Sequence, residues 1–352
     1  MARAIYGPWH DFDLDAVGRS SGHLYIPVST SRSAYGNLRI PLVVVRGGKG
    51  PAALLMAGNH GDEFEGQVAL SRIAAMLEPQ HLDGTVILMP AANLPAVLAS
   101  QRVSPMDDGN FNTSFPGQND GGPTRQIAHF VEAELLPRVN LWMDLHSGGN
   151  SLLYTPLAAI HQSDDAALDR KALDLLHAFG APTSVVFRLQ HEYAASSSAQ
   201  RHGIPYLYGE FGGAATVDPD GLRIATEGTL RSLAKLGILR ADSLLVPPPR
   251  EPGHLLETVT GRDFRDTRRN FIFAPRAGVF ECTFELRKKV EAGALGGYIH
   301  AVESPGIPPT PVYFEMGGIA IARRHLARVE EGDCLAQIAI ERGWSAACTG
   351  RD

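Results

Sequence analysis

The sequence predicts an α/β fold: a mixed sheet flanked by helices, followed by a smaller, β-rich C-terminal domain. Between residues 39 and 237, fully apolar runs typical of buried strands alternate with segments of helical periodicity. The proline-rich segment 246–253 (VPPPREPG) ends this alternation, and short β-like segments separated by glycines follow it. We therefore predict a catalytic-type α/β domain over residues 1–245 and a β-rich domain over residues 246–352.

The individual elements follow from the same patterns. Strands are expected at 39–47, 52–57, 85–93, 140–146, 183–189 and 204–210. Helices are expected at 64–78, 126–137, 165–180 and 221–237. Pro137 ends the second helix, and Gly180 and Gly237 close the last two. Residues 1–38 are polar and rich in serine and glycine, with only short β-like pieces.

Composition narrows the class of protein. The chain has 352 residues, of which 44% are hydrophobic, and a formal net charge of -6, which gives no electrostatic reason to expect nucleic acid or an anionic membrane as a partner. Three distant cysteines (Cys282, Cys334 and Cys348) form no CxxC pair, which argues against a disulfide scaffold and a cysteine-based zinc site. The N-terminus lacks a signal-peptide core, and no apolar stretch is long enough to span a membrane. A cytoplasmic protein is expected.

The segment Gly58-Asn59-His60-Gly61-Asp62-Glu63 is the sharpest local motif. It follows the apolar strand 52–57 and precedes a helix, and in open α/β sheets binding sites gather at such strand ends. The spacing of His60 and Glu63 lets an imidazole nitrogen and a carboxylate oxygen converge on one cation. Alone, this HxxE spacing is a weak signal and is more typical of a surface loop with two unrelated polar residues, so a second strand end is needed.

His146 provides that second strand end, because it closes the apolar run LWMDLH and precedes Ser-Gly-Gly. Together with His60 and Glu63 it completes a set of three ligands with an open fourth position, which is typical of a catalytic zinc site. Asp144 lies two residues earlier, on the same side of the strand. It either accepts a hydrogen bond from a ligand histidine or is an ordinary buried aspartate.

Glu210 marks a third strand end, in IPYLYGEFGG. Hydrolysis of an amide at zinc needs a base for the attacking water and an acid for the leaving amine, and one carboxylate near the metal can serve as both. Glu210 is our candidate for this group, with a salt bridge in a loop as the alternative.

These motifs carry a family resemblance. GNHGDE, MDLHSGG and GEFGG, in this order and with these gaps, resemble the succinylglutamate desuccinylase/aspartoacylase family, a branch of the zinc carboxypeptidase fold. Within it, the N-terminal segment and the stretch SPMDDGNFNTSFPG are similar to the bacterial N-acetyl-2,4-diaminobutyrate deacetylases of ectoine breakdown. The resemblance implies one zinc ion per chain on His60, Glu63 and His146, with Glu210 as base and acid.

The resemblance also implies substrate contacts, and there the chain departs from the family. An Asn-Arg pair usually precedes Ser-Phe-Pro-Gly, whereas this chain has Asn112 and Thr113. The missing arginine normally clamps the substrate carboxylate by a bidentate contact, which threonine cannot make. Arg102 is placed like the second family arginine, which polarises the scissile carbonyl. Arg201 is our candidate for the lost clamp; both arginines are equally compatible with ordinary surface positions.

The expected activity is zinc-dependent hydrolysis of the amide bond of a small N-acyl amino acid such as N2-acetyl-2,4-diaminobutyrate. Desuccinylation, carboxypeptidase-like cleavage and a non-catalytic, metal-dependent binding function are the alternatives. The ligand set suits zinc without excluding cobalt or manganese. A homo-oligomer is expected only from the resemblance. The C-terminal segment resembles a biotinyl/lipoyl-like β module without a modifiable lysine signature, which indicates a structural lid or an assembly surface.

Overall fold

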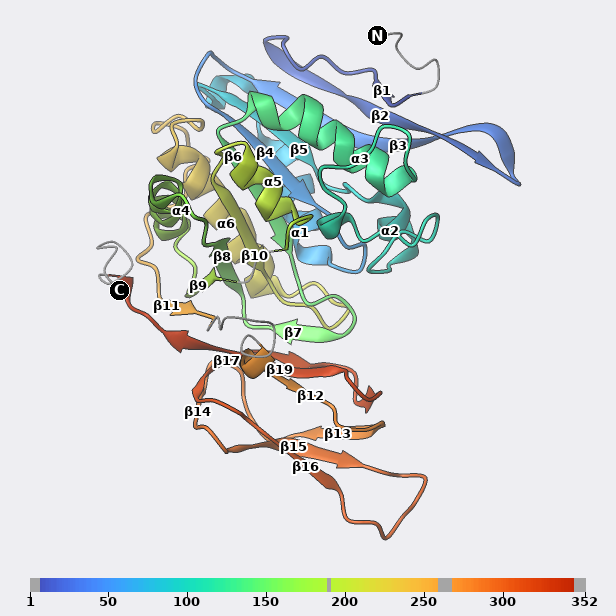
Figure 1. The fold of residues 1–352 in the computed structure, drawn as a ribbon. Coiled ribbons are helices and arrows are strands. Elements are labelled where there is room, and N and C mark those ends of the chain that lie inside the picture. Colours follow the sequence, from blue (N-terminus) through green and yellow to red (C-terminus); the bar gives the residue numbers. More distant parts are fainter. Residues whose placement is uncertain (1–6, 189–190, 259–267, 345–352) are drawn as a thin grey trace.

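A long mixed sheet runs through the structure, which is a computed structural model (Figure 1). The structure describes residues 7–188, 191–258 and 268–344. In spatial order the strands of this sheet are β1 (Trp9–His10), β2 (Gly18–Thr30), β3 (Ser33–Arg46), β5 (Thr85–Met89), β4 (Ala52–Ala57), β6 (Leu141–His146), β10 (Tyr206–Glu210), β8 (Leu157–His161), β9 (Thr183–Phe187), β11 (His254–Glu257), β19 (Cys334–Glu341), β17 (Gly318–Arg324) and β14 (Lys289–Val290). β12 (Phe271–Phe273) pairs with β19, and β7 (Leu152–Tyr154) pairs with β17.

The four strands β5, β4, β6 and β10 are parallel neighbours at the centre of this sheet. Their carboxyl ends therefore lie along one edge, where ligand sites of open α/β sheets form. Their side chains alternate between two apolar cores. Along β4, for example, Leu55 packs into one core and Leu54 into the other, and both are fully buried.

Helices cover both faces of the central strands. α1 (Phe64–Met76), α4 (Ala166–Phe179) and α6 (Pro219–Lys235) contribute to the core on one face. On the other face lie α3 (Pro123–Phe130), α5 (Ala195–Arg201) and the 3-10 turn η2 (Phe111–Thr113). The short helix α2 (Leu94–Ala99) follows β5. The remaining turns are η1 (Pro79–His81), η3 (Val131–Leu135), η4 (Leu136–Arg138) and η5 (Arg268–Asn270).

The C-terminal β region both extends the main sheet and adds a second one. β11 pairs parallel with β9 and antiparallel with β19, so the hydrogen-bonded ladder continues out of the α/β part. The second sheet has the order β16 (Thr310–Tyr313), β15 (Leu295–His300), β13 (Gly278–Cys282) and β18 (Arg328–Val329), and it lies at the lower end of the molecule in Figure 1. A separate apolar cluster that includes Phe280, Ile299 and Ile338 fills this region. The domain boundary at residue 245 stays a prediction.

The predicted fold class is confirmed: a mixed α/β sheet with flanking helices and a separate C-terminal β region. Some elements differ. The strand expected at 39–47 is the end of the much longer β3, which forms a hairpin with β2, so the short β-like pieces expected in residues 1–38 belong to long strands. β5 ends at Met89, and α3 begins at Pro123, where a proline fits the first helical turn. Residue 189, the expected end of β9, lies outside the described residues.

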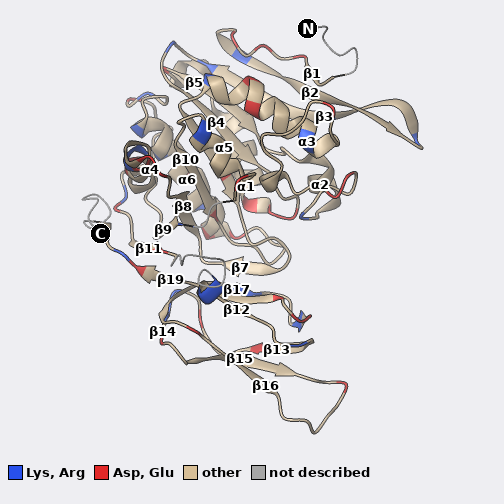
Figure 2. Ribbon diagram, in the orientation of Figure 1, with Lys and Arg blue, Asp and Glu red and all other residues tan. Residues whose placement is uncertain are grey.

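Charged residues and cysteines are distributed without a single dominant feature in the part of the chain that the structure describes. Figure 2 shows acidic and basic residues along both the α/β part and the C-terminal β region. Cys282 and Cys334 are free thiols, and Cys348 lies outside the described residues. Within the described ranges, no helix is long and apolar enough to cross a bilayer.

Candidate active site

The turn between β4 and α1 brings His60 and Glu63 to the edge of the sheet. Gly58 has a φ of 66°, a left-handed conformation that glycine adopts without strain. A Cβ atom on Gly61 would overlap the backbone carbonyl of Ala96, so only glycine fits there. Glu63 then stands at the N-terminal boundary of α1. The two glycines thus allow the tight turn that aims both predicted ligands at one point.

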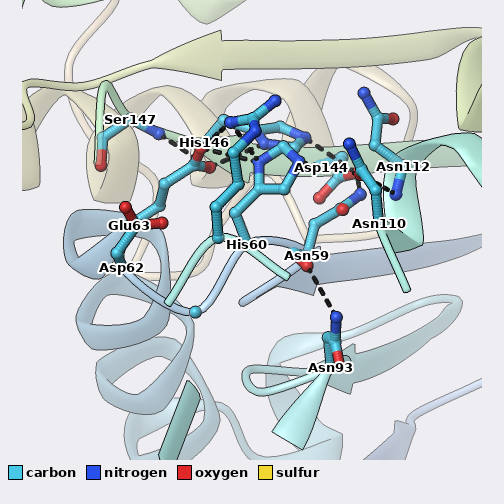
Figure 3. A network of polar contacts seen from close by, with 12 residues as sticks. Asn59, His60, Asp62, Glu63, Asn93, Asn110, Asn112, Asp144, His146 and Ser147 are labelled. Carbon is cyan, nitrogen blue, oxygen red and sulfur yellow. Dashed lines mark hydrogen bonds and ion pairs between the residues drawn. The ribbon is translucent and has the colours of Figure 1, made fainter. Parts of the chain in front are cut away.

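His146 reaches the same point from the neighbouring strand. β6 pairs in parallel with β4, so its last residue lies beside the β4 turn. The Nδ1 atoms of His60 and His146 lie 2.7 Å and 2.8 Å from the two carboxylate oxygens of Glu63. One ligand atom from each of the three residues lies within 4.8 Å of the others, and all three residues are buried (Figure 3).

The surroundings of the two imidazole rings fit a metal centre. His146 Nε2 lies 3.1 Å from Asp144 Oδ2, and His60 Nε2 lies 3.2 Å from Asn110 Oδ1. Acceptors at both Nε2 atoms can take the protons of these nitrogens, which would leave each Nδ1 free to bind a metal ion that Glu63 also binds. Two imidazoles and one carboxylate are the donor set of many catalytic zinc sites. The three residues can therefore hold a divalent metal ion.

Asp144 is itself held in place. It is fully buried, and its Oδ2 atom also accepts hydrogen bonds from Asn59 Nδ2 at 3.0 Å and the Tyr206 hydroxyl at 3.1 Å. These donors orient the carboxylate towards His146. The geometry matches the first of the two alternatives predicted for Asp144, a partner of a ligand histidine.

The buried charges of this cluster shift the pKa values of their neighbours. Burial alone would raise the pKa of Glu63, but the adjacent His60 and His146 hold it well below its usual range. Burial would lower the pKa of His146, but the carboxylates of Asp144 and Glu63 raise it well above its usual value. Without a metal, a proton on His146 partly balances the buried carboxylates. Metal binding must release protons, so it should weaken as the pH falls.

Glu210 ends β10, the next strand along the sheet, and pairs in register with His146. Its Oε2 atom is buried and has no hydrogen-bond partner within the described residues. Burial, followed by the negative charge of Glu63, raises the pKa of Glu210 to about 8. A carboxyl group with an unpartnered oxygen and a raised pKa is suited to exchange protons with a reactant.

One cavity of about 390 Å³ joins most of these groups. It is lined by His60, Glu63, Arg102, Asn112, Thr113, His146, Ser147, Gly148, Ser151, Leu152, Tyr154, His161, His191, Ala194, Ser196, Tyr206, Tyr208 and Glu210. The side chain of Arg102 is 59% exposed, and its Nη1 atom lies 3.6 Å from Glu63 Oε1. The cavity therefore combines the cation site, an unpartnered acid and a guanidinium group.

Residues 49–236 match the catalytic domain of the succinylglutamate desuccinylase/aspartoacylase family. The N-alpha-acetyl-L-2,4-diaminobutyric acid deacetylase of Halomonas elongata is 37% identical over 328 residues, which cover 93% of each protein. The chain belongs to this family. Its members are amide-bond deacylases, so the protein is an enzyme that hydrolyses amides.

Solved structures support membership of the desuccinylase/aspartoacylase family. The product-bound ectoine utilization protein EutE (DoeB) from Ruegeria pomeroyi aligns with a TM-score of 0.88 at 33% identity, covering 95% of this chain and 98% of that one. A succinylglutamate desuccinylase from Silicibacter sp. TM1040 aligns with the same TM-score at 32% identity and the same coverage. The predicted resemblance, including its finer match to the diaminobutyrate deacetylases, is confirmed.

Two predicted site residues, Asp144 and Arg201, do not line the cavity. Asp144 contacts His146, whereas Arg201 lies apart from the site. Its Nη1 atom donates to the carbonyl oxygen of Glu192 at 3.1 Å, and its Nη2 atom lies 3.8 Å from Glu132 Oε1. It lines a separate depression together with Ser197. On α5, Ser196 lines the cavity, and a residue five positions later points roughly 140° away. Its position gives no support to a clamp, which stays a prediction.

Several cavity residues were not predicted. Tyr206, Tyr208 and Glu210 are spaced two residues apart along β10. The two-residue period of a strand would therefore have placed all three on the same face. His161 ends β8, a strand that the sequence analysis did not anticipate. Asn110, which was not predicted either, does not line the cavity; it lies two residues before Asn112, and its contact with His60 joins segments fifty residues apart in the chain.

Proposed function

We propose that this member of the family is a zinc-dependent deacylase of small N-acyl amino acids, with N2-acetyl-2,4-diaminobutyrate as the favoured substrate. The observation that carries the proposal is the convergence of His60, Glu63 and His146 with the unpartnered Glu210 in one cavity. The identity to the Halomonas deacetylase over nearly the whole chain supports the choice of substrate.

The chain's own residues account for the proton transfers. A zinc ion on His60, Glu63 and His146 would supply Lewis acidity, lowering the pKa of water and polarising the acyl carbonyl. Glu210 accepts a proton from the attacking water, whose oxygen adds to the carbonyl carbon. Arg102 donates hydrogen bonds to the oxygen on which negative charge develops. Glu210 then passes its proton to the amine nitrogen as the carbon–nitrogen bond breaks, leaving a carboxylic acid and an amine, which leave as a carboxylate and an ammonium ion.

The charge of the cavity favours a substrate with few carboxylate groups. Among the described residues that line it, Arg102 is the only arginine and there is no lysine. Asn112 and Thr113 line the wall, so the usual Asn-Arg pair is replaced by uncharged groups. N-succinylglutamate carries three carboxylates, whereas N2-acetyl-2,4-diaminobutyrate carries one carboxylate and one ammonium group. N2-acetyl-2,4-diaminobutyrate therefore needs fewer cationic partners. Its acetyl group needs none, because it lacks the free carboxylate of a succinyl group.

The decisive experiment is amine release from purified protein, with and without a chelator. Substrates are N2-acetyl-2,4-diaminobutyrate, N-acetylaspartate, N-succinylglutamate and a short peptide. Chelator-sensitive release that is fastest from the first substrate is the expected result. Faster release from the second, third or fourth would move the substrate assignment. No release from any, in protein that carries one metal per chain, would favour a non-catalytic, metal-dependent binding protein.

Arg102→Ala is expected to lower kcat/KM by roughly 10²- to 10³-fold, the usual loss when one oxyanion donor is removed. Arg102→Lys should lose less, because it keeps the charge without the planar fork of donors. Steady-state kinetics on N2-acetyl-2,4-diaminobutyrate measure both. Arg125→Ala, which removes an exposed arginine that contacts Gln118, is the matched control. An Arg102→Ala rate close to that of the control would remove Arg102 from the mechanism.

Location and assembly belong to the same proposal. A small polar substrate from amino-acid metabolism suits an enzyme of the cytoplasm. A homo-oligomer remains an expectation drawn from the family, and size-exclusion chromatography with light scattering measures it directly.

A further inference from the structure

The wall segment Ser151–Thr155 connects the catalytic cavity to the C-terminal β region. Ser151, Leu152 and Tyr154 line the cavity. β7, which contains Leu152 and Tyr154, pairs antiparallel with β17, with Tyr154 opposite Ala322. In Figure 1, β7 lies at the junction of the α/β part and the lower β region. This part of the cavity wall is therefore positioned by strands that follow the α/β part in the chain.

Further hydrogen bonds hold both ends of the segment. The amide of Thr155 donates to the carbonyl of Ile321 at 2.9 Å, and the amide of His325 donates to the carbonyl of Ser151 at 2.9 Å. Arg287 Nε also donates to the Thr155 hydroxyl at 2.6 Å. These contacts fix the backbone on either side of Tyr154.

Gln337 fixes the side chain of Tyr154. The Tyr154 hydroxyl donates to Gln337 Oε1 at 2.8 Å, across 183 positions of sequence. Gln337 is 3% exposed, and it sits on β19 beside Ile338, which packs into the apolar cluster of the C-terminal region. A buried amide is costly unless its hydrogen bonds are made, so an apolar residue would be the default at this position. The contact with Tyr154 accounts for the amide.

The contact also determines where the tyrosine proton goes. A phenol has one proton to donate, and here it is directed to Gln337. Burial, followed by the charge of Glu210, raises the pKa of Tyr154 well above its usual value, so the hydroxyl stays neutral. Glu210 Oε2 has no partner within the described residues. Tyr154 thus forms the cavity wall without donating its proton to the proposed base.

We propose that Gln337 is a positioning residue of the catalytic cavity: it holds the Tyr154 hydroxyl in the wall that faces the substrate, so that the C-terminal β region sets the geometry in which Glu210 works. The inference rests on the proposed deacylase function. It gives the C-terminal β region a positioning role in catalysis beyond covering or assembly.

The test uses a double-mutant cycle in the full-length, zinc-loaded protein. Gln337→Met removes the acceptor and nearly preserves side-chain volume, whereas Gln337→Glu retains an acceptor oxygen at the same distance along the side chain. Tyr154→Phe removes the donor. Ile338→Val, on the same strand but in the apolar cluster, is the control for a loss of packing. Each variant is compared for kcat, KM, zinc content and melting temperature.

The expected result is that Gln337→Met lowers kcat/KM by roughly 10-fold, as Tyr154→Phe does, with full zinc content. In the Tyr154→Phe background, Gln337→Met should have no further kinetic effect, because the contact is already absent. Gln337→Glu should recover part of the rate. Equal kinetic losses from Gln337→Met with and without the tyrosine hydroxyl would overturn the inference, as would an unchanged kcat/KM.

A second measurement does not depend on turnover. Protein labelled with 3-fluorotyrosine gives a ¹⁹F resonance for Tyr154, assigned by its loss in Tyr154→Phe. Gln337→Met should shift this resonance, and Ile338→Val should not; the absence of a shift would overturn the inference. If wild-type protein releases no amine from any substrate, the proposed function fails, while the resonance still decides whether Gln337 positions Tyr154.

Discussion

Replacing Glu210 by glutamine is expected to lower kcat by roughly 10²- to 10⁴-fold, the usual contribution of a general acid–base group. Glutamine has nearly the same shape as glutamate but can neither accept the water proton nor deliver it to the amine. The three proposed metal ligands are untouched, so the zinc content should stay at one per chain. Steady-state kinetics combined with elemental analysis of the same sample measure both quantities.

Glu65→Gln provides a matched control for this substitution. Glu65 is a fully buried carboxylate whose pKa is raised by burial, but it does not line the cavity. Its Oε1 atom accepts hydrogen bonds from the amides of Gly213 and Asp218, and a glutamine oxygen can accept them too. Glu65→Gln should therefore keep near-normal kcat. A Glu210→Gln enzyme as fast as this control would show that another group moves the protons.

Glu210→Gln should also change how the stability of the metal-free protein depends on pH. The pKa of Glu210 is raised to about 8 by burial and then by Glu63, so folding favours its protonated form. Protonated Glu210 contributes fully to the stability of the folded protein at pH values below the pKa of about 4.3 that glutamate has in the unfolded chain. This contribution is lost as the pH rises through the folded-state pKa of about 8. Glutamine never ionises. The melting temperature of the variant should therefore rise relative to wild type across this window, which calorimetry at several pH values measures.

Much of the site could be predicted because its residues follow local patterns. Three apolar runs end at His146, Glu210 and the glycine-flanked turn before His60, and strands buried on both faces are recognisable from composition alone. Parallel neighbours then bring those ends to one edge. Little tertiary information was needed to expect that His60, Glu63 and His146 would lie together with Glu210 near them.

The parts that were not predicted depend on contacts between distant segments. Tyr154 meets Gln337 across 183 positions, and no local pattern marks either residue. β8 is a five-residue strand with an ordinary apolar sequence, so its position beside β10 emerges only from the sheet. Arg201 was a candidate because of its charge and its nearness to β10 in sequence. The rotation of α5 decides its direction, and sequence distance does not report that rotation.

His60→Ala is expected to remove bound metal and activity together. The variant leaves one imidazole and one carboxylate, which are too few ligands to hold zinc in a catalytic site. Zinc per chain should fall from one to near zero after dialysis, and amine release should fall to background. His300→Ala on the C-terminal sheet, which removes an exposed histidine paired with Glu281, is the matched control. Inactive His60→Ala protein that still carries one zinc per chain would place the metal elsewhere.

Asp144→Asn tests whether Asp144 orients the ligand His146 or binds the metal ion itself. The asparagine side chain would keep the shape of the aspartate but lose the charge that faces His146 Nε2 at 3.1 Å. Loss of such an outer partner typically weakens metal binding by about 10- to 100-fold, so saturating zinc should restore site occupancy and much of the activity. His60→Ala should not recover at any zinc concentration. If both variants respond alike to added zinc, Asp144 would have to be a ligand itself, because only loss of a direct bond makes the two substitutions equivalent.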